Sequence, residues 1–341
     1  MGGFASTLNN YKAATAQSFP PKPKFSTDQI PDLAGRVVIV TGGNTGIGKE
    51  TVKNPSNLQA LLEHNAKVYL AARSKSRADA AIADLKATTG KDAIFLELDL
   101  ANLASVRRAA EEYLSKEQEL HILFNNAGVM WCPVEMMTED GYDMQFGTNV
   151  LGHFFFTELL MPALFAGVKS SPDGHARVVT TSSSAAYLDT LHPETFRDHP
   201  KRKKMGSKGL YFQSKFMALW DEVLIVSRSR SLKGNAVVAR EVARRYADKG
   251  ILSYSCNPGN LWTDLQRYAS SAERLFIKYI TYPASFGALT QLWGGTMPDV
   301  VDHNGDFLIP WARLGRCRKE VYDPKVGEEL WSYLEEQVKD K

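Results

Sequence analysis

Short runs of β-branched and other apolar residues alternate with longer segments of helical periodicity along the chain. Helical patterns cover, for example, residues 78–86 and 105–114. Continuous apolar strands that alternate with helices are typical of a parallel sheet that is buried on both faces and joined by right-handed crossovers. The pattern therefore predicts a doubly wound α/β fold with a mostly parallel sheet and helices on both faces. The predicted strands are Val37-Val38-Ile39-Val40, Val68-Tyr69-Leu70, Ile94-Phe95-Leu96, Ile122-Leu123-Phe124, Val178-Val179 and Ile251-Leu252-Ser253-Tyr254.

Residues 1–32 lack this periodicity. They contain the segment Phe19-Pro20-Pro21-Lys22-Pro23-Lys24, which is typical of an extended arm, and we expect order to begin at Asp32. Neither an internal repeat nor a linker divides the remainder. We therefore expect residues 33–341 to form a single domain.

Composition narrows the class of protein. The chain has 341 residues, of which 44% are hydrophobic and 23% are charged, and this balance excludes a disordered or collagen-like chain. Lys and Arg number 41 against 38 for Asp and Glu, and the resulting net charge of +3 is too weak to indicate a nucleic-acid partner.

The cysteines and histidines indicate the redox compartment of the protein and whether it has a metal site. The three cysteines form no CxxC pair, which favours free thiols in a reducing compartment, and the seven histidines show no metal-ligand spacing. We find no apolar run long enough to span a bilayer and no signal peptide, so we expect a cytoplasmic protein without an integral membrane segment. The N-terminal Met1-Gly2-Gly3-Phe4-Ala5-Ser6 matches the permissive pattern for N-myristoylation at Gly2.

The first predicted strand runs into a glycine-rich turn that opens a helix. The turn is Thr41-Gly42-Gly43-Asn44-Thr45-Gly46-Ile47-Gly48. A strand, a glycine turn and a helix N-terminus together present backbone N–H groups to a phosphate. A P-loop is the alternative, because Gly43 to Lys49 satisfies GxxxxGK. However, Glu50 occupies its Mg²⁺-ligating Ser/Thr position, and a carboxylate there would repel nucleotide phosphates.

The TGxxxGxG spacing of this turn and the motifs that follow it resemble the short-chain dehydrogenase/reductase family, and within it the retinol-dehydrogenase-like branch and its fungal NADP-dependent relatives. The match covers roughly residues 33–312 and implies a Rossmann domain with a substrate-covering segment at about residues 262–282. The later motifs are Asp99, Asn125-Asn126-Ala127-Gly128, Asn149, Ser182-Ser183-Ser184, Tyr211-Phe212-Gln213-Ser214-Lys215 and Asn257-Pro258-Gly259.

This resemblance implies a set of cofactor-binding residues. Asp99 would face the adenine, although it also suits a helix N-cap, and Pro258-Gly259 also suits a plain turn. The implied set is Thr41, Gly42, Asn44, Gly46, Ile47 and Gly48 in the turn, Asp99 and Leu100 after the third strand, Asn126, Ala127 and Gly128 in the cofactor wall, Tyr211 and Lys215 in the catalytic helix, and Leu261 and Thr263 at the nicotinamide end.

Cofactor preference is indicated at the end of the second strand. Enzymes that use NAD usually place a carboxylate there on the ribose 2′-OH, but this strand ends in Ala71-Ala72-Arg73. An arginine offers a bidentate donor to a 2′-phosphate, so the sequence predicts NADP(H). Lys75 and Arg77 would add to that site, unless these basic residues are simply solvated.

Four residues are candidates for catalysis. Tyr211 and Lys215 lie four apart, which on a helix places both on one face, and an ammonium beside a phenol stabilises its phenolate. In the family this lysine also holds the nicotinamide ribose. Ser183 follows the fifth strand and would hydrogen-bond the substrate oxygen. Asn149 resembles the family asparagine that holds a proton-relay water.

Two further groups of residues are ambiguous. Lys201-Arg202-Lys203-Lys204 is interpreted as a solvated loop rather than a nuclear signal or a phosphate site. An apolar set falls where the family has its covering segment, although core packing would explain some members equally well. The set is Leu265, Tyr268, Leu275, Phe276, Tyr279 and Tyr282.

Two segments do not fit the pattern around them. Residues 54–59 place Pro55 inside the second predicted helix and rotate its apolar stripe by about 240° at ~100° per residue. Residues 217–233 separate Phe216 from Gly234, where the catalytic helix should continue. Our hypothesis is that both are inserts relative to the family, such as retained introns; a real, specialised variant is the alternative.

The sequence thus predicts an NADP(H)-dependent oxidoreductase that interconverts a carbonyl and an alcohol of a small, apolar molecule. An alternative of another class is a catalytically impaired binding protein with the same fold, disabled by the two inserts. The substrate, the physiological direction and the choice between homodimer and monomer are left open.

Overall fold

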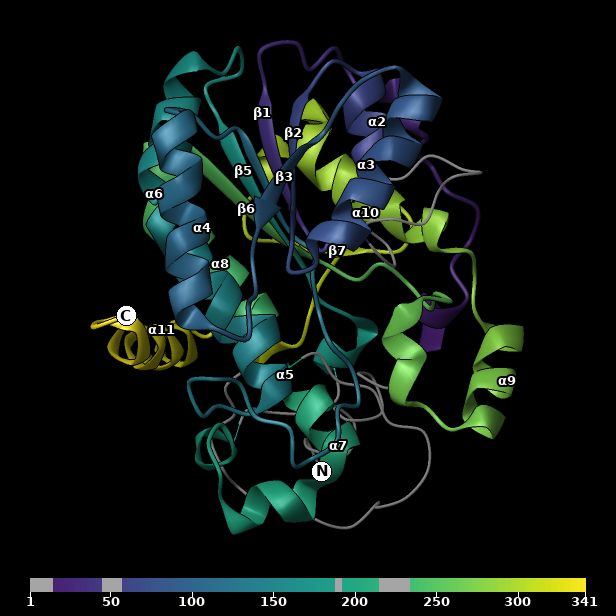
Figure 1. Ribbon diagram of the computed structural model, residues 1–341, viewed down its shortest axis with the longest axis vertical. Helices are drawn as coiled ribbons and strands as arrows, with labels where there is room; N and C mark the ends of the chain where they lie inside the picture. Colours follow the sequence, from purple (N-terminus) through teal and green to yellow (C-terminus); the bar gives the residue numbers. More distant parts are fainter. Residues whose placement is uncertain (1–14, 45–56, 188–191, 215–233) are drawn as a thin grey trace.

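The computed structural model describes residues 15–44, 57–187, 192–214 and 234–341. Its sheet has eight strands in the order β3-β2-β1-β4-β5-β6-β7-β8, all parallel to their neighbours except β8, which pairs antiparallel with β7 (Figure 1). The strands are β1 (Val37–Thr41), β2 (Lys67–Ala72), β3 (Ile94–Glu97), β4 (Ile122–Asn125), β5 (Ala176–Thr181), β6 (Ile251–Cys256), β7 (Phe307–Ile309) and β8 (Arg313–Gly315). The predicted parallel α/β fold is confirmed, and all six predicted strands fall within β1 to β6.

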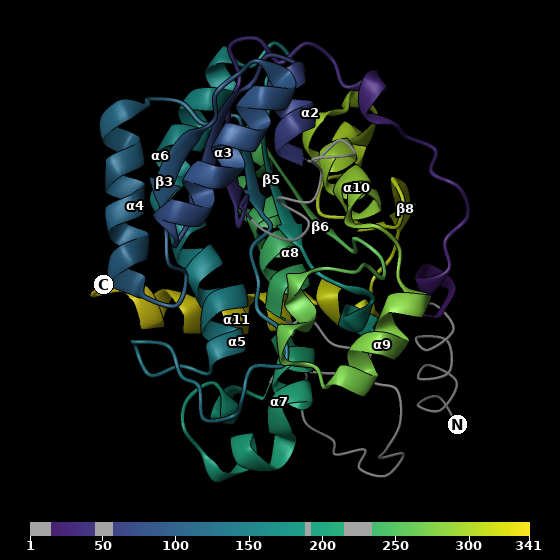
Figure 2. The same ribbon diagram turned by 45° about the vertical axis from the view of Figure 1, so that its right-hand side comes forward.

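Helices cover both faces of the sheet. On one face lie α2 (Asn57–Glu63), α3 (Lys75–Thr89) and α10 (Ala284–Thr296), and on the other lie α4 (Leu103–Lys116), α6 (Gly152–Ser170) and α8 (Gly234–Tyr246) (Figures 1 and 2). Below the carboxyl ends of the strands are α5 (Met144–Phe146), α7 (Pro200–Ser214) and α9 (Ser271–Ile280), and α11 (Pro324–Val338) crosses beneath α8.

The side chains of β1 alternate between the two faces of the sheet, which explains why helices must cover both faces. Val37 and Ile39 belong to the core cluster beneath α4, α6 and α8, whereas Val38 and Val40 belong to the cluster beneath α2, α3 and α10. Successive strand side chains point to opposite faces. Each fully buried side chain of this size stabilises the fold by roughly 1.5–3 kcal/mol, so neither face of β1 can be left exposed.

A single helical run from Met144 to Ser170 joins α5 to α6 through a π-helical stretch, Gly147–Leu151. The expectation that no apolar segment could span a bilayer is wrong by length and composition, because this run meets both criteria. However, 72% of its most apolar window is buried within the fold. Its hydrophobicity therefore matches the position of a core helix between the sheet, α4 and α11.

The N-terminal segment departs from the predicted extended arm. Residues 15–18 are helical, and Gln17 is buried and accepts a hydrogen bond from the Asn257 side chain at 2.8 Å. Phe25 and Ile30 are buried in the core cluster beneath α10. Order therefore does not begin at Asp32, because the apolar residues that interrupt this polar segment dock on the domain.

The two suspected inserts fall largely outside the described residues. Residues 54–56 lie outside them, whereas residues 57–59 form the first turn of α2. Residues 217–233 lie outside as well. On either side of that segment, α7 ends at Ser214 and α8 begins at Gly234, and a Cβ added to Gly234 would lie 3.3 Å from the Ser214 carbonyl oxygen. The two helix ends are therefore adjacent in space.

Candidate functional site

A pocket lies at the carboxyl ends of the parallel strands, between the sheet and the segment that contains α9. Most of the predicted site residues line it. They are Thr41, Gly42, Asn44, Arg73, Asp99, Leu100, Asn126, Ala127, Gly128, Ser183, Tyr211, Leu261 and Thr263. Gly46, Ile47, Gly48 and Lys215 lie outside the described residues, and Asn149 is fully buried away from the pocket lining.

The start of the glycine turn is packed against the wall formed by Asn126 and Ala127. Gly42 has a φ of +68°, and a Cβ there would lie 3.0 Å from Ala127, so this position requires glycine. The Thr41 hydroxyl oxygen accepts hydrogen bonds from the Asn126 and Ala127 amides at 2.9 Å, and the Asn126 side chain donates to the Thr41 carbonyl. Gly42, Asn126 and Ala127 all line the pocket, which fits the glycine-rich cradle that a dinucleotide requires.

Basic side chains lie at the β2 end of the pocket. Arg73 is exposed and lines it, and Arg77 lines it one helical turn later. Lys75 does not, because its ammonium pairs with Asp79 at 2.8 Å on the surface of α3. Arg73 and Arg77 are therefore the basic residues that line the pocket at the end of β2.

Asp99 does not serve as a helix N-cap. Its carboxylate accepts a hydrogen bond from the Ala101 amide at 2.9 Å, and Asn102 caps α4 by accepting from the Ser105 amide. Asp99 and Leu100 both line the pocket, and the contact of Asp99 with the adenine stays a prediction.

The opposite end of the pocket holds the candidate reacting groups. Ser183 follows β5, and Tyr211 lies in the last turns of α7 with only 8% of its surface exposed. Burial raises the pKa of the Tyr211 phenol above its usual range. A phenol in this position needs a neighbouring cation to act as an acid or base near neutral pH.

Asn149 is held by its neighbours rather than presented to the pocket. Its side-chain oxygen accepts from the Val129 amide at 2.9 Å, and its amide nitrogen donates to the Val129 carbonyl and to the Ser214 hydroxyl, both at 3.0 Å. These bonds use both amide hydrogens. The Asn149 side chain therefore fixes the wall beside the pocket and the end of α7.

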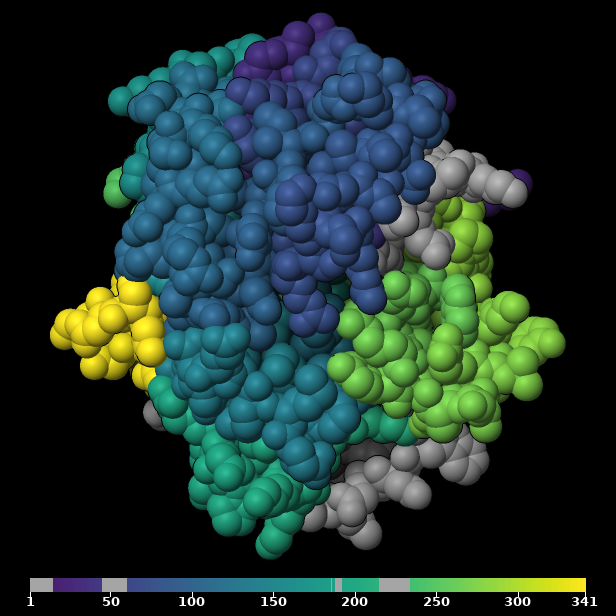
Figure 3. Space-filling model, in the orientation of Figure 1, coloured from purple at the N-terminus to yellow at the C-terminus, as the bar shows by residue number. Residues whose placement is uncertain are grey.

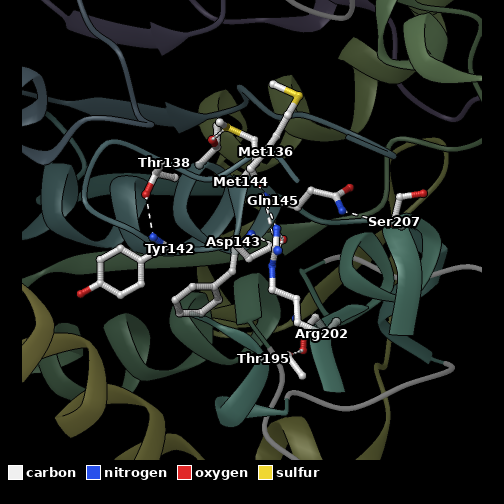
Figure 4. A network of polar contacts seen from close by, with 12 residues as sticks. Met136, Thr138, Tyr142, Asp143, Met144, Gln145, Thr195, Arg202 and Ser207 are labelled. Carbon is white, nitrogen blue, oxygen red and sulfur yellow. Dashed lines mark hydrogen bonds and ion pairs between the residues drawn. The ribbon is translucent and has the colours of Figure 1, made fainter. Parts of the chain in front are cut away.

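The interpretation of Lys201-Arg202-Lys203-Lys204 as a solvated loop is wrong for Arg202 and for the loop, although the three lysines are exposed. These residues are helical, and Arg202, which points toward Asp143 in Figure 4, is buried. Its guanidinium pairs with Asp143 at 3.2 Å and donates to the Met136 carbonyl at 3.0 Å. Charge runs are usually solvated, and the sequence alone does not show that Asp143 lies opposite.

Asp143 also begins the helix that carries Asn149. Its second carboxylate oxygen accepts from the Gln145 and Phe146 amides at 3.1 and 2.9 Å. Gln145 in turn accepts from the Trp131 amide and donates to the Ser207 carbonyl of α7 (Figure 4). This network joins the segment below the cofactor wall to α7. Within α7, Gly206 has a φ of +69°, which separates the basic turn from the turns that carry Tyr211.

The segment over the pocket forms a lobe that stands out beside α3 (Figure 3). Ile277 and Ile280 of α9 line the pocket, as does Leu265. The outer residues of the predicted apolar set are exposed, whereas Tyr282 packs on Trp311 with ring centroids 4.9 Å apart. Those exposed residues are Tyr268, Leu275, Phe276 and Tyr279.

Comparison with known proteins identifies the family. The sequence model for short chain dehydrogenase matches residues 36–192. A short-chain dehydrogenase/reductase of Armillaria gallica is 55% identical to this chain over 98% of its length and 100% of the relative. The chain belongs to the short-chain dehydrogenase/reductase family. Another relative, mouse retinol dehydrogenase 11, is 37% identical, and the match covers 88% of this chain and 85% of the mouse protein.

Solved structures agree on the fold. An uncharacterized protein of Mycobacterium paratuberculosis superposes with a TM-score of 0.63 and 25% identity, covering 92% of this chain and 97% of that one. A Shigella flexneri short chain dehydrogenase, solved with NADP, superposes with a TM-score of 0.58 and 19% identity. The match covers 83% of this chain and 98% of that one. This short-chain dehydrogenase/reductase is therefore an oxidoreductase with the family's nucleotide-binding Rossmann fold.

Proposed function

We propose that this family member is an NADP(H)-dependent oxidoreductase that interconverts a carbonyl and an alcohol of a small, apolar molecule. The observation that carries the proposal is a single pocket lined by Arg73 and Arg77 at one end and by Ser183 and Tyr211 at the other. A guanidinium suits a 2′-phosphate because it offers charged, bidentate donors. The glycine turn and Asn126 to Gly128 would hold the cofactor between these ends.

The reacting end divides the chemistry among the side chains. A bound nicotinamide supplies or accepts the hydride at the substrate carbon. The Tyr211 hydroxyl gives its proton to the carbonyl oxygen during reduction and takes it back during oxidation. Ser183 donates a hydrogen bond to the same oxygen and stabilises the charge that develops on it.

Tyr211 needs help to act as an acid or base at neutral pH. Burial raises the pKa of its phenol, so a cation must lower it again. Lys215, one helical turn along the sequence, is the residue we assign to this role, although it lies outside the described residues. Loss of Lys215 should therefore impair both turnover and cofactor affinity.

The apolar character of the substrate is supported by the residues over the pocket. Leu261, Leu265, Ile277 and Ile280 line the pocket, and so do Trp131 and Met144. The retinol named for the mouse relative is itself an apolar alcohol, which agrees with such a lining.

Purified full-length protein tests the proposal. Titration with NADPH and with NADH should show tighter binding of NADPH, and NADPH should be oxidised when apolar aldehydes and ketones are added. Binding of NADPH without oxidation on any carbonyl would instead support the catalytically impaired binding protein.

A further inference from the structure

His153 lies in the first turn of α6, in the interior between the cofactor wall and the start of the long helix. Its side chain is buried, with only 3% of the residue exposed. Its Nε2 lies 2.9 Å from the Thr41 hydroxyl oxygen, and its Nδ1 lies 3.1 Å from the Asn149 carbonyl oxygen. The imidazole therefore joins the glycine turn to the residue that braces the end of α7.

The hydrogen bonds of Thr41 determine which nitrogen of His153 carries the proton. The Thr41 hydroxyl oxygen already accepts from two amides, those of Asn126 and Ala127. A hydroxyl has two lone pairs and one hydrogen, so only its hydrogen is left for His153 Nε2 or for the Phe124 carbonyl at 3.2 Å. Thr41 therefore has no lone pair left for an Nε2 hydrogen, and the Asn149 carbonyl oxygen at Nδ1 can only accept, so the neutral ring carries its hydrogen on Nδ1 and leaves Nε2 as an acceptor.

The two partners of His153 hold the same stretch of backbone. Thr41 accepts from the amides of Asn126 and Ala127, and the Asn149 side chain bonds both the amide and the carbonyl of Val129. These residues form the wall on which the cofactor would lie. Through His153 the two ends of the wall are also connected to each other.

The network continues to the reacting end of the pocket. Asn149 donates to the Ser214 hydroxyl at 3.0 Å, and Ser214 donates to the Tyr211 carbonyl at 2.8 Å. Hydrogen bonds thus connect the cofactor wall, Thr41 and His153 to the main-chain carbonyl of Asn149, and the side chain of Asn149 continues the connection through Ser214 to the turn that carries Tyr211. Each of these side chains is buried.

We propose that His153 is a positioning residue, held as the Nδ1–H tautomer, that couples the cofactor wall to the turn of Tyr211. This coupling rests on the proposed function, because it matters for turnover only if the wall binds cofactor and Tyr211 transfers the proton. Among the described residues, His153 is not one of those that line the pocket.

Two substitutions separate the two ends of the imidazole. His153→Asn keeps a donor near Nδ1 for Asn149 but leaves nothing at the Nε2 position. His153→Gln keeps an acceptor near Nε2 for Thr41 but removes the donor at Nδ1. We expect His153→Asn to raise the Kd for NADPH more than it lowers kcat, and His153→Gln to lower kcat more than it raises Kd, each main effect being about tenfold.

His153→Phe loses both bonds and should show both effects, whereas the surface variant His303→Gln should show neither. Thermal unfolding of every variant is measured alongside. Parallel losses of stability, Kd and kcat in both His153→Asn and His153→Gln would show that the imidazole only fills space, and would overturn the proposal.

The tautomer has a readout that requires no turnover. Nitrogen-15 NMR of labelled protein should show a protonated Nδ1 and an unprotonated Nε2 for the resonances that disappear in His153→Phe. A proton on Nε2 would overturn the proposal, whatever the kinetics. If the wild type oxidises no NADPH, the proposed function fails, and the NMR spectrum alone then decides on His153.

Discussion

Asp143 and Arg202 form an ion pair in which each side chain is only 2% exposed. Asp143 caps the helix that leads to Asn149, and Arg202 belongs to the first turns of the helix that leads to Tyr211. The pair therefore joins the two helical segments that bound the reacting end of the pocket. Burial raises the pKa of the Asp143 carboxyl above its ordinary value, even though the guanidinium and two amides stabilise its charge.

Removing one partner of this pair should destabilise the protein strongly. Arg202→Met leaves the Asp143 carboxylate buried without its cation, and breaking such a pair costs about 3–5 kcal/mol. Lys203→Met, the exposed neighbour, serves as the matched control and should change stability little. Urea unfolding measures both, and equal stability of the two variants would show that the pair contributes nothing.

Cofactor preference should depend on Arg73. In Arg73→Asp a carboxylate replaces the guanidinium at the β2 end of the pocket, so attraction for a 2′-phosphate becomes repulsion. The preference for NADPH over NADH should fall at least tenfold, corresponding to about 1.5 kcal/mol. Lys86→Asp makes the same charge change farther along α3, where Lys86 pairs with Asp92, and should leave the ratio unchanged. An unchanged ratio in Arg73→Asp would place the 2′-phosphate elsewhere.

Deleting residues 217–233 should raise both the thermal midpoint and the activity. The ends of α7 and α8 are adjacent, as the 3.3 Å approach of Gly234 to Ser214 indicates, so the shortened chain can run on as one helix. Replacing the same residues by a Gly/Ser segment of equal length is the control. It removes the side chains of residues 217–233 but keeps α7 and α8 equally far apart along the chain. A deletion variant that melts lower and loses activity would mean that the segment is an integral part of the fold.

Glu158 should make stability depend on pH. Burial raises the pKa of its carboxyl to about 7 from an ordinary 4.5, and the Tyr246 hydroxyl lies 3.3 Å away. Between these values the native chain retains a proton that the unfolded chain releases. The stabilisation is therefore full below about pH 4.5 and is lost as the pH rises to 7, by about 3 kcal/mol.

Glu158→Gln should remove this dependence, because the amide cannot titrate. Unfolding measured from pH 5 to 8 should show the wild type losing stability relative to Glu158→Gln as the pH rises. Glu111→Gln, on the exposed surface of α4, should follow the wild type. A constant difference between wild type and Glu158→Gln at every pH would refute the assignment.

The sequence was sufficient for the parts of the fold that rest on local patterns. Strands β1 to β6 are runs of apolar residues, and such runs are visible without any knowledge of their neighbours. β7 and β8 were missed because each has three residues, too few to show a period. Their pairing depends on contacts between distant segments.

The same distinction applies to the site. Thr41 and Tyr211 stand in motifs with fixed spacing, and Arg73 follows the second predicted strand, so their shared pocket could be anticipated. Burial of Arg202 depends on Asp143, and the docking of the N-terminal segment depends on Asn257 and the core beneath α10; in both cases the partner is remote in sequence. His153 carried no signal, because a single histidine in an apolar helix indicates no particular partner.

In the proposed function, Tyr211 supplies the proton that accompanies hydride transfer between NADPH and a carbonyl. The most direct test uses NADPH in which both hydrogens at C4 are replaced by deuterium. A panel of apolar aldehydes and ketones is added, and the mass of each alcohol produced is measured. The wild type and the exposed control Tyr279→Phe should yield alcohol with one deuterium on the former carbonyl carbon, whereas Tyr211→Phe should bind NADPH but lose turnover at least a hundredfold. Labelled alcohol from Tyr211→Phe at the wild-type rate, or none from wild type that binds NADPH, would contradict this account.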